Sequence, residues 1–339
     1  MIKRNKIAAT VLSAVAAATV LAGCSSPNTS SGSAGNAGSP PGAQDAKVTF
    51  LTVSQTCDYC ARQAESFKST MEEAGAKVTT VTTNFDAAEQ AQQINQAVSS
   101  KPDAIVLWPA DASAVVPSLK RIKAAGIPVV VSTSIPNSED TSLWSSFTGP
   151  DNEALGAAAA RALISGLKEK GLGTSGSVIM VTGTAGAAST IGRTDGFTST
   201  LAKEAPELKI VGSQPGNWDQ TQATTAAAAL FSQFDKVIGV YGQADNMTAG
   251  AITAAERAGY KPGENLIAVG SDCTIDGYNN IEAGKQYATN LQDPKLDGQN
   301  VANAAISVLE GKEVENVTWM ETPLITEGNL SECASAVGK

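Results

Sequence analysis

The chain has 339 residues, a formal charge of −9 and no histidine. This length suits two domains of ordinary size, and the acidic charge argues against nucleic acid as a partner, because phosphate contacts need a basic surface. The absence of histidine excludes Ser-His-Asp catalysis, histidine proton shuttles and most zinc sites. We expect no cofactor and no metal.

The first 46 residues have the composition of a leader rather than of a folded domain. Lys3, Arg4 and Lys6 precede an apolar run, 7–20, that is too short for an ordinary membrane span. The following Leu-Ala-Gly-Cys24 resembles the bacterial lipobox. That resemblance implies a signal peptide at 1–23 and a lipid anchor on Cys24 at the extracytoplasmic face of the cell membrane; a plain secretory signal is the alternative. Residues 24–46, rich in Ser, Gly and Pro, predict a flexible tether.

From residue 47 onward, short apolar strands alternate with amphipathic helices. The first unit is a strand at 48–54, a loop with Cys57-Asp-Tyr-Cys60, and a helix at 61–74. The further predicted strands are 104–107, 126–131, 177–181, 209–213, 236–241, 266–270 and 288–291, with a last extended piece at 317–326. The further predicted helices are 114–125, 152–169, 193–204, 219–234, 247–258, 275–283 and 296–310. This alternation predicts parallel sheets with helices on both faces, in two doubly wound α/β domains.

Polar and aromatic residues recur just after the predicted strands. Because the carboxyl ends of parallel strands meet at one edge, we expect these residues to surround a ligand crevice. The candidates are Asp58, Tyr59, Trp108, Arg193, Trp218, Asp245, Asp272 and Gln292, with Thr133 and Ser134 beside them. Aromatic faces pack against the C–H patches of sugars, and carboxylates accept hydrogen bonds from hydroxyls. The set favours a small neutral sugar or polyol.

The cysteines allow a second interpretation. Apart from Cys24 there are four cysteines, which in an exported chain predict two disulfides with three possible connectivities. We favour Cys57–Cys60 with Cys273–Cys333. Alternatively, Cys57 and Cys60 form a catalytic thiol-disulfide pair at a helix N-terminus. A glycosidase that uses Asp245 and Asp272 as its acid and base is a further alternative.

Several ordered motifs give the region 48–326 a family resemblance. They are Ile-Pro-Val-Val-Val131, Thr148-Gly-Pro-Asp-Asn152 followed by Leu155-Gly156, Ile191-Gly-Arg-Thr-Asp-Gly-Phe197, Gly242-Gln-Ala-Asp-Asn-Met247, Val269-Gly-Ser-Asp272 with Asp276-Gly277, and Leu291-Gln-Asp-Pro294. Together they resemble the ribose-type periplasmic sugar-binding proteins, the substrate receptors of ABC importers. The resemblance implies the type I fold of that group, in which two α/β domains joined by three crossing strands close on a ligand.

The resemblance also implies roles and limits for particular parts of the chain. It implies a stacking aromatic at Tyr59, a ligand-binding arginine at Arg193, an aromatic at Trp218, a carboxylate at Asp272 and a hinge-side glutamine at Gln292. The implied domains are 47–149 plus 293–322 and 150–292 plus 323–339. The chain departs from the ribose-type pattern at three places: Cys60 replaces a second aromatic, Thr133-Ser134 replaces Asp-Arg, and Ala244 replaces Asn.

We therefore expect a solute-binding lipoprotein, not an enzyme, that delivers a neutral sugar or polyol to the permease domains of an ABC importer. We expect it to be a monomer, anchored to the membrane through Cys24. A sensor that presents its bound ligand to a signalling receptor is the alternative. The sequence leaves ribose itself in doubt as the ligand, because the departures remove several polar contacts to a cyclic pentose.

Overall fold

The computed structural model describes residues 42–339. The predicted signal peptide, the lipidation site Cys24 and most of the predicted tether lie outside these residues. Within the described part of the chain, no helix has both the length and the apolar character that crossing a bilayer requires.

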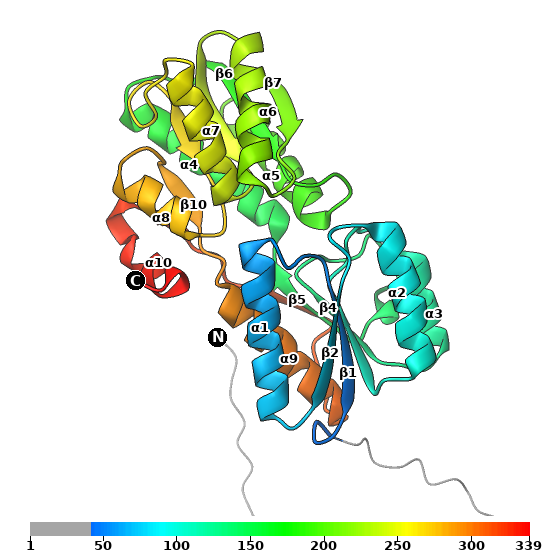
Figure 1. Cartoon of the computed structure of the whole chain (residues 1–339). Helices are drawn as coiled ribbons and strands as arrows, with labels where there is room; N and C mark the ends of the chain where they lie inside the picture. The colour runs from blue at the N-terminus through cyan, green and yellow to red at the C-terminus, as the bar shows by residue number, and fades with distance from the viewer. Residues whose placement is uncertain (1–41) are drawn as a thin grey trace, which may run out of the picture. The chain divides into compact units, whose positions relative to one another are not determined.

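The strands form two six-stranded sheets, one in each of two lobes (Figure 1). The N-lobe sheet contains β1 (Lys47–Thr52), β2 (Lys77–Thr82), β3 (Ala104–Leu107), β4 (Val129–Ser132), β5 (Ser146–Pro150) and β11 (Val317–Met320). Its order is β11-β5-β4-β3-β1-β2, and every neighbouring pair is parallel. The strands β3 and β4 are buried along their whole length, as expected for a parallel sheet covered on both faces.

The C-lobe sheet repeats this arrangement with one antiparallel edge. It contains β6 (Gly176–Thr182), β7 (Leu208–Pro215), β8 (Val237–Gly242), β9 (Ile267–Val269), β10 (Ala288–Asn290) and β12 (Leu324–Thr326), in the order β12-β10-β9-β8-β6-β7. Only β12 runs antiparallel to its neighbour among the paired strands described. The predicted fold class, two α/β domains with largely parallel sheets, is confirmed.

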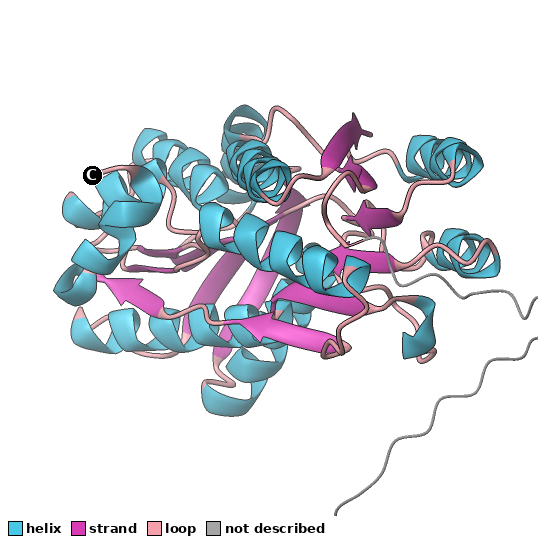
Figure 2. Cartoon of the chain, turned by 90° about the horizontal axis from the view of Figure 1, so that it is seen from below, coloured by secondary structure: helices cyan, strands magenta, loops and turns pink. Residues whose placement is uncertain are grey.

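Helices cover both faces of each sheet (Figure 2). In the N-lobe, α1 (Asp58–Glu73) and α9 (Pro294–Leu309) pack on one face, and α2 (Ala87–Ser100) and α3 (Val116–Ala124) on the other. In the C-lobe, α4 (Asn152–Glu169) and α5 (Ala188–Glu204) cover one face, and α6 (Gln220–Gln233) and α7 (Asp245–Arg257) the other. The shorter elements are α8 (Ile275–Glu282), α10 (Ser331–Val337), η1 (Thr141–Leu143) and η2 (Glu327–Asn329).

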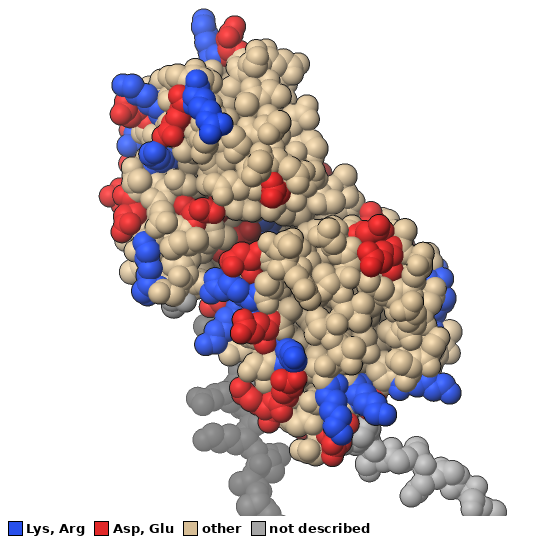
Figure 3. Space-filling model, viewed as in Figure 1, with Lys and Arg blue, Asp and Glu red and all other residues tan. Residues whose placement is uncertain are grey.

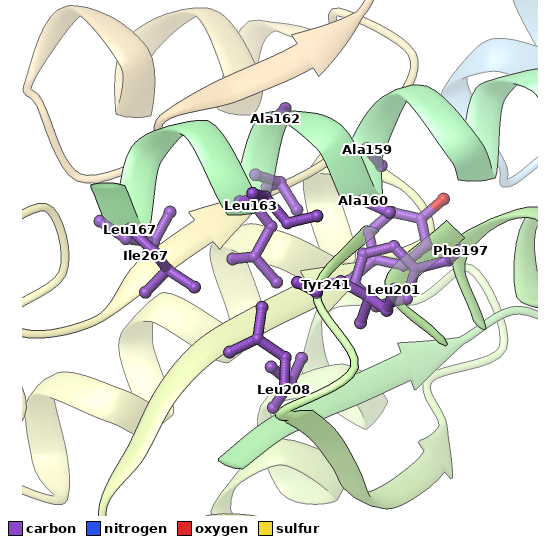
Figure 4. Packing of buried hydrophobic residues seen from close by; sticks show 14 of the residues in the cluster. Ala159, Ala160, Ala162, Leu163, Leu167, Phe197, Leu201, Leu208, Tyr241 and Ile267 are labelled. Carbon is purple, nitrogen blue, oxygen red and sulfur yellow. The ribbon is translucent and has the colours of Figure 1, made fainter. Parts of the chain in front are cut away.

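The core between α4, α5 and the C-lobe sheet is built from small and large residues that interdigitate (Figure 4). Phe197 stacks on Tyr241 with ring centroids 4.4 Å apart. Two glycines bring the helices together, since a Cβ on Gly196 would lie 1.9 Å from the Glu153 carbonyl oxygen and one on Gly156 would lie 2.2 Å from that of Arg193. This close approach holds the start of α5 against the start of α4, at the carboxyl edge of the sheet.

The chain crosses between the lobes three times: after β5, between β10 and α9, and between β11 and β12. The last crossing corrects a prediction, because the stretch 317–326 is two strands in different sheets rather than one extended piece. The strands β2 and β5 and the helices α2 and α10 were not predicted. The predicted tether also ends too late, because Ala43 and Ala46 are buried against the N-lobe.

Candidate functional site

A cavity of about 360 Å³ lies at the carboxyl ends of the strands and is lined by residues of both lobes. Figure 3 shows the surface hollowed between the two lobes at this position. Seven of the eight predicted ligand-contact residues line the cavity: Asp58, Tyr59, Trp108, Arg193, Trp218, Asp272 and Gln292. Further lining residues include Phe85, Thr133, Ser134, Asn152, Asp219 and Asp276.

The N-lobe wall presents aromatic side chains that are fixed by their neighbours. Trp108 is only 7% exposed, and its indole N–H donates to Ser134 Oγ at 3.2 Å. Tyr59, in the first turn of α1, meets Trp108 edge to face, with centroids 6.1 Å apart. Its hydroxyl donates to Asp297 Oδ2 at 3.0 Å. The ring is therefore held as an amphipathic surface, with an apolar face and a polar tip.

Arg193 is the centre of the C-lobe wall. Its side chain is 5% exposed and pairs with Asp272, Nη1 to Oδ1, at 3.1 Å. The Nε atom donates to Asn152 Oδ1 at 3.1 Å, Nη1 also donates to the Gln243 carbonyl oxygen, and Gln292 donates to the same Asp272 oxygen. Burial raises the pKa of Asp272, and the guanidinium opposes that rise. The pairing holds a buried cation and anion in fixed directions.

Trp218 closes the C-lobe side in an unusual backbone conformation. Both Asn217 and Trp218 have positive φ, 51° and 63°, which is uncommon for residues other than glycine. The indole lies on the backbone of Gly183, where a Cβ would be 1.9 Å from the ring. The Arg193 guanidinium carbon lies 5.8 Å from the ring centroid. The ring is therefore wedged between a glycine and a cation.

The prediction that Asp245 contacts the ligand is wrong. Asp245 is completely buried and does not line the cavity, although its neighbours Ala244 and Asn246 do. Its carboxylate accepts hydrogen bonds from the Thr274 backbone at 3.0 Å, from Gln286 at 2.7 Å and from Thr289 at 2.9 Å. Burial raises the pKa of Asp245 to about 8. The side chain points into the lobe because α7 begins at Asp245, two residues earlier than predicted.

Carboxylates from the two lobes lie near each other in the lining of the cavity. Asp58 belongs to α1 and Asp276 to α8, and both line the cavity. Burial and the nearby charge of Asp58 raise the pKa of Asp276. Sequence reasoning did not assign a role to Asp276 or Asn152, although both belong to motifs that the family resemblance singles out. Phe85 had no such signal, because the unit of β2 and α2 was not predicted.

The four cysteines are paired in the structure as Cys57–Cys60 and Cys273–Cys333. The respective Cα–Cα distances are 5.2 Å and 5.9 Å. Cys57 is the N-cap residue of α1, and Cys273 follows Asp272 directly. Each disulfide therefore borders a loop that supplies a residue to the cavity, one in each lobe.

Comparison with known proteins places this geometry in a family. A periplasmic binding protein domain model matches residues 48–313. The chain is 27% identical over 248 residues to a xylitol-binding protein of Mycolicibacterium smegmatis, covering 73% of this chain and 68% of that protein. It is 27% identical over 253 residues to the ribose import binding protein RbsB of Bacillus subtilis, covering 75% and 78%. A solved Mycobacterium smegmatis protein in complex with β-D-fucofuranose superimposes with a TM-score of 0.78 at 26% identity, covering 86% of this chain and 98% of that one. The chain belongs to the periplasmic binding protein family.

Proposed function

We propose that the protein is an extracytoplasmic solute-binding lipoprotein that captures a small neutral sugar or polyol by hinge closure and delivers it to an ABC importer. The observation that carries this proposal is one cavity, between two lobes, with aromatic faces and fixed polar groups on both walls. The names of the relatives support the ligand class, since they include proteins for xylitol and ribose.

The lining favours a ligand without negative charge. Among the described residues, four carboxylate side chains and a single guanidinium line the cavity, and the guanidinium already pairs with Asp272. An anionic ligand would face uncompensated carboxylates in a partly desolvated site, which is costly. Hydroxyl groups instead match both the carboxylate acceptors and the guanidinium donors.

The hinge explains how such a cavity can fill and empty. Gln292 lies in the crossing between β10 and α9, and its side chain donates a hydrogen bond to Asp272, which follows β9 in the C-lobe. We take the predicted domain limits, 47–149 with 293–322 and 150–292 with 323–339, as the two bodies that move. Closure then brings the walls together on the ligand and excludes water.

A thermal-shift screen tests the proposal. The purified protein is heated with xylitol, D-ribose, D-allose, D-fructose and myo-inositol, and with sugar phosphates as anionic controls. A bound neutral compound raises the melting temperature with its concentration, by mass action. If no member of a broad neutral panel shifts the melting temperature, or if only the phosphates do, the proposed ligand class is wrong.

The lipid anchor needs its own experiment because Cys24 lies outside the described residues. Detergent phase partitioning of the exported chain compares the wild type with Cys24→Ser. A lipidated wild type enters the detergent phase and the variant stays in the aqueous phase. Equal partitioning of both into the aqueous phase would favour the alternative of a plain secretory signal.

A further inference from the structure

Asp297 is a buried carboxylate directly behind the N-lobe wall of the cavity. It lies in the first turn of α9 and is 0% exposed. It does not line the cavity, but both residues that bond to its Oδ2 atom do: Tyr59 at 3.0 Å and Thr133 Oγ1 at 2.9 Å. Neither sequence reasoning nor the family comparison assigns a role to Asp297.

The directions of these hydrogen bonds follow from chemistry. An ionised carboxylate can only accept, so Tyr59 and Thr133 each give their single O–H hydrogen to Asp297. Thr133 Oγ1 also lies 2.9 Å from Ser132 Oγ, and in that contact it can only accept. Ser132 in turn accepts from Gln63 Nε2 at 2.8 Å. All hydrogen bonds of this network can therefore be assigned with one set of donors and acceptors, in which Asp297 is the final acceptor.

The charge states of the groups around Asp297 agree with this assignment. Burial raises the pKa of Asp297 to about 6, against the hydrogen bonds from Thr133 and Tyr59, and Asp293 on the same helix raises it further. The carboxyl is therefore ionised at neutral pH. Burial and the charges of Asp297 and Asp272 raise the pKa of Tyr59 well above its usual value, and Arg193 opposes this. Tyr59 therefore keeps its proton and donates it to Asp297.

The consequence for the cavity is a division of hydrogen-bonding roles between its walls. The hydroxyl oxygens of Tyr59 and Thr133 have only lone pairs left for a ligand. On the opposite wall, the Nη2 atom of Arg193 makes no hydrogen bond with any of residues 42–339. The N-lobe wall can therefore accept hydrogen bonds from a ligand through Tyr59 and Thr133, and the C-lobe wall can donate one through Arg193.

We propose that Asp297 is a positioning residue that sets the hydrogen-bond polarity of the N-lobe wall and so selects ligands that donate there: uncharged polyols and sugars over the corresponding sugar acids. The selection acts through Tyr59 and Thr133. The inference rests on the proposed function and adds to it a residue that determines specificity.

The test is calorimetric titration of wild type and Asp297→Asn with two matched pairs, xylitol with xylonate and D-ribose with D-ribonate, at pH 7.5. In the variant the amide N–H can donate to the Tyr59 oxygen, so that the phenol O–H turns into the cavity. We expect the neutral probe to bind about tenfold more weakly and its preference over the acid to shrink by about tenfold, the size of one charge-assisted hydrogen bond. Asp103→Asn, at the opposite end of the same sheet, should leave both quantities unchanged.

Two further measurements separate positioning from a loss of structure. In a background that carries both Tyr59→Phe and Thr133→Val, neither hydroxyl that donates to Asp297 is present, so adding Asp297→Asn should change the neutral-to-acid preference by less than twofold. Wild-type affinity for the neutral probe should fall as the pH is lowered from 7.5 to 5, and it should fall more steeply than that of Asp297→Asn, because only the wild type can protonate residue 297. Asp272 and Asp276, which also have raised pKa values and line the cavity, are present in both proteins and cancel in this comparison. If Asp297→Asn does not fold, Tyr59→Phe and Thr133→Val carry the test, because each removes one oriented oxygen and should reduce the same preference.

The outcomes distinguish the inference from the proposed function. If wild type binds neither a neutral probe here nor any neutral compound of the screen, the proposed function fails. If wild type binds a neutral probe and Asp297→Asn keeps the wild-type preference and pH profile, the role of Asp297 is refuted while the proposed function stands.

Discussion

Gly183→Ala should weaken ligand binding without adding or removing any group in the cavity. Gly183 lies under the indole of Trp218, and a Cβ there would be 1.9 Å from Cζ2 and 2.2 Å from Cη2. Carbon atoms rest at about 3.5 Å, so the ring must move outward by about 1.6 Å. The backbone of Gly183 lies outside the positive-φ region, so alanine introduces no backbone strain, and the effect comes from the displaced ring.

The magnitude follows from the apolar contact that the displaced ring loses. One indole face against a sugar buries about 80 Å² of apolar surface, which at about 25 cal/mol per Å² is about 2 kcal/mol, or thirtyfold in Kd. Calorimetry with the compound identified in the screen measures the change. Gly328→Ala is the matched control, because its Cβ would meet nothing closer than Thr326 Oγ1 at 3.7 Å.

A double variant makes the interpretation falsifiable. In a Trp218→Ala background there is no ring to displace, so adding Gly183→Ala should cost less than about 0.5 kcal/mol more, the usual limit of additivity. If Gly183→Ala binds as tightly as wild type, the indole does not contact the ligand. If it weakens binding equally with and without Trp218, the effect has another origin and Gly183 does not position the indole.

Three further predictions concern stability, each measured by urea unfolding. Arg193→Ala leaves Asp272 buried without its partner and should cost about 3 to 5 kcal/mol; a loss under 1 kcal/mol would show that the pair is well solvated. Burial raises the pKa of Asp297 from 3.8 to about 6. The protonated carboxyl therefore stabilises the folded state at low pH, and this contribution to the unfolding free energy is lost as the pH rises through 6. The unfolding free energy of wild type relative to Asp297→Asn should therefore fall by about 3 kcal/mol from pH 3.5 to 7, and a flat difference would contradict the raised pKa. Cys333→Ser opens a link across 60 residues and should cost about 4 kcal/mol. Wild type in reductant should lose at least as much, because reductant also opens Cys57–Cys60, and an unchanged midpoint in reductant would contradict a stabilising disulfide.

Most strands and helices of the C-lobe could be predicted, because local sequence signals there agree with the final fold. Short apolar runs such as 177–181 and 237–241, bounded by turn residues, are typical of the strands of a covered parallel sheet. The unit of β2 and α2 escaped prediction because β2 is an edge strand without a fully buried position. Its threonines and lysine therefore lack the apolar run that identified the other strands.

Within the site, the sequence predicts which residues lie near the cavity better than it predicts which way their side chains point. Residues after strands do gather at one cavity, since parallel strands share a carboxyl edge. Whether a side chain there points to the ligand depends on where the next helix starts. Asp245 turns inward because α7 already includes it.

Asp297 is the opposite case, a residue that supports the cavity wall and that the sequence does not reveal. It follows a strand end by several residues and, in sequence, looks like an ordinary acidic residue in the first turn of a helix. Only the packing of α9 against α1 and β4 brings it behind Tyr59 and Thr133. A contact between residues 238 positions apart cannot be predicted from local patterns in a single sequence.

Calorimetric titration of the purified protein with xylitol, D-ribose and the other neutral members of the panel tests most directly whether the interlobe cavity captures an uncharged polyhydroxylated ligand. We predict saturable binding of at least one member with a stoichiometry of one per chain, quenched or shifted fluorescence of the tryptophans that line the cavity, and strong weakening in Trp218→Ala. Binding that is absent across the panel, or that persists unchanged in Trp218→Ala, would contradict the assignment of this cavity as the ligand site.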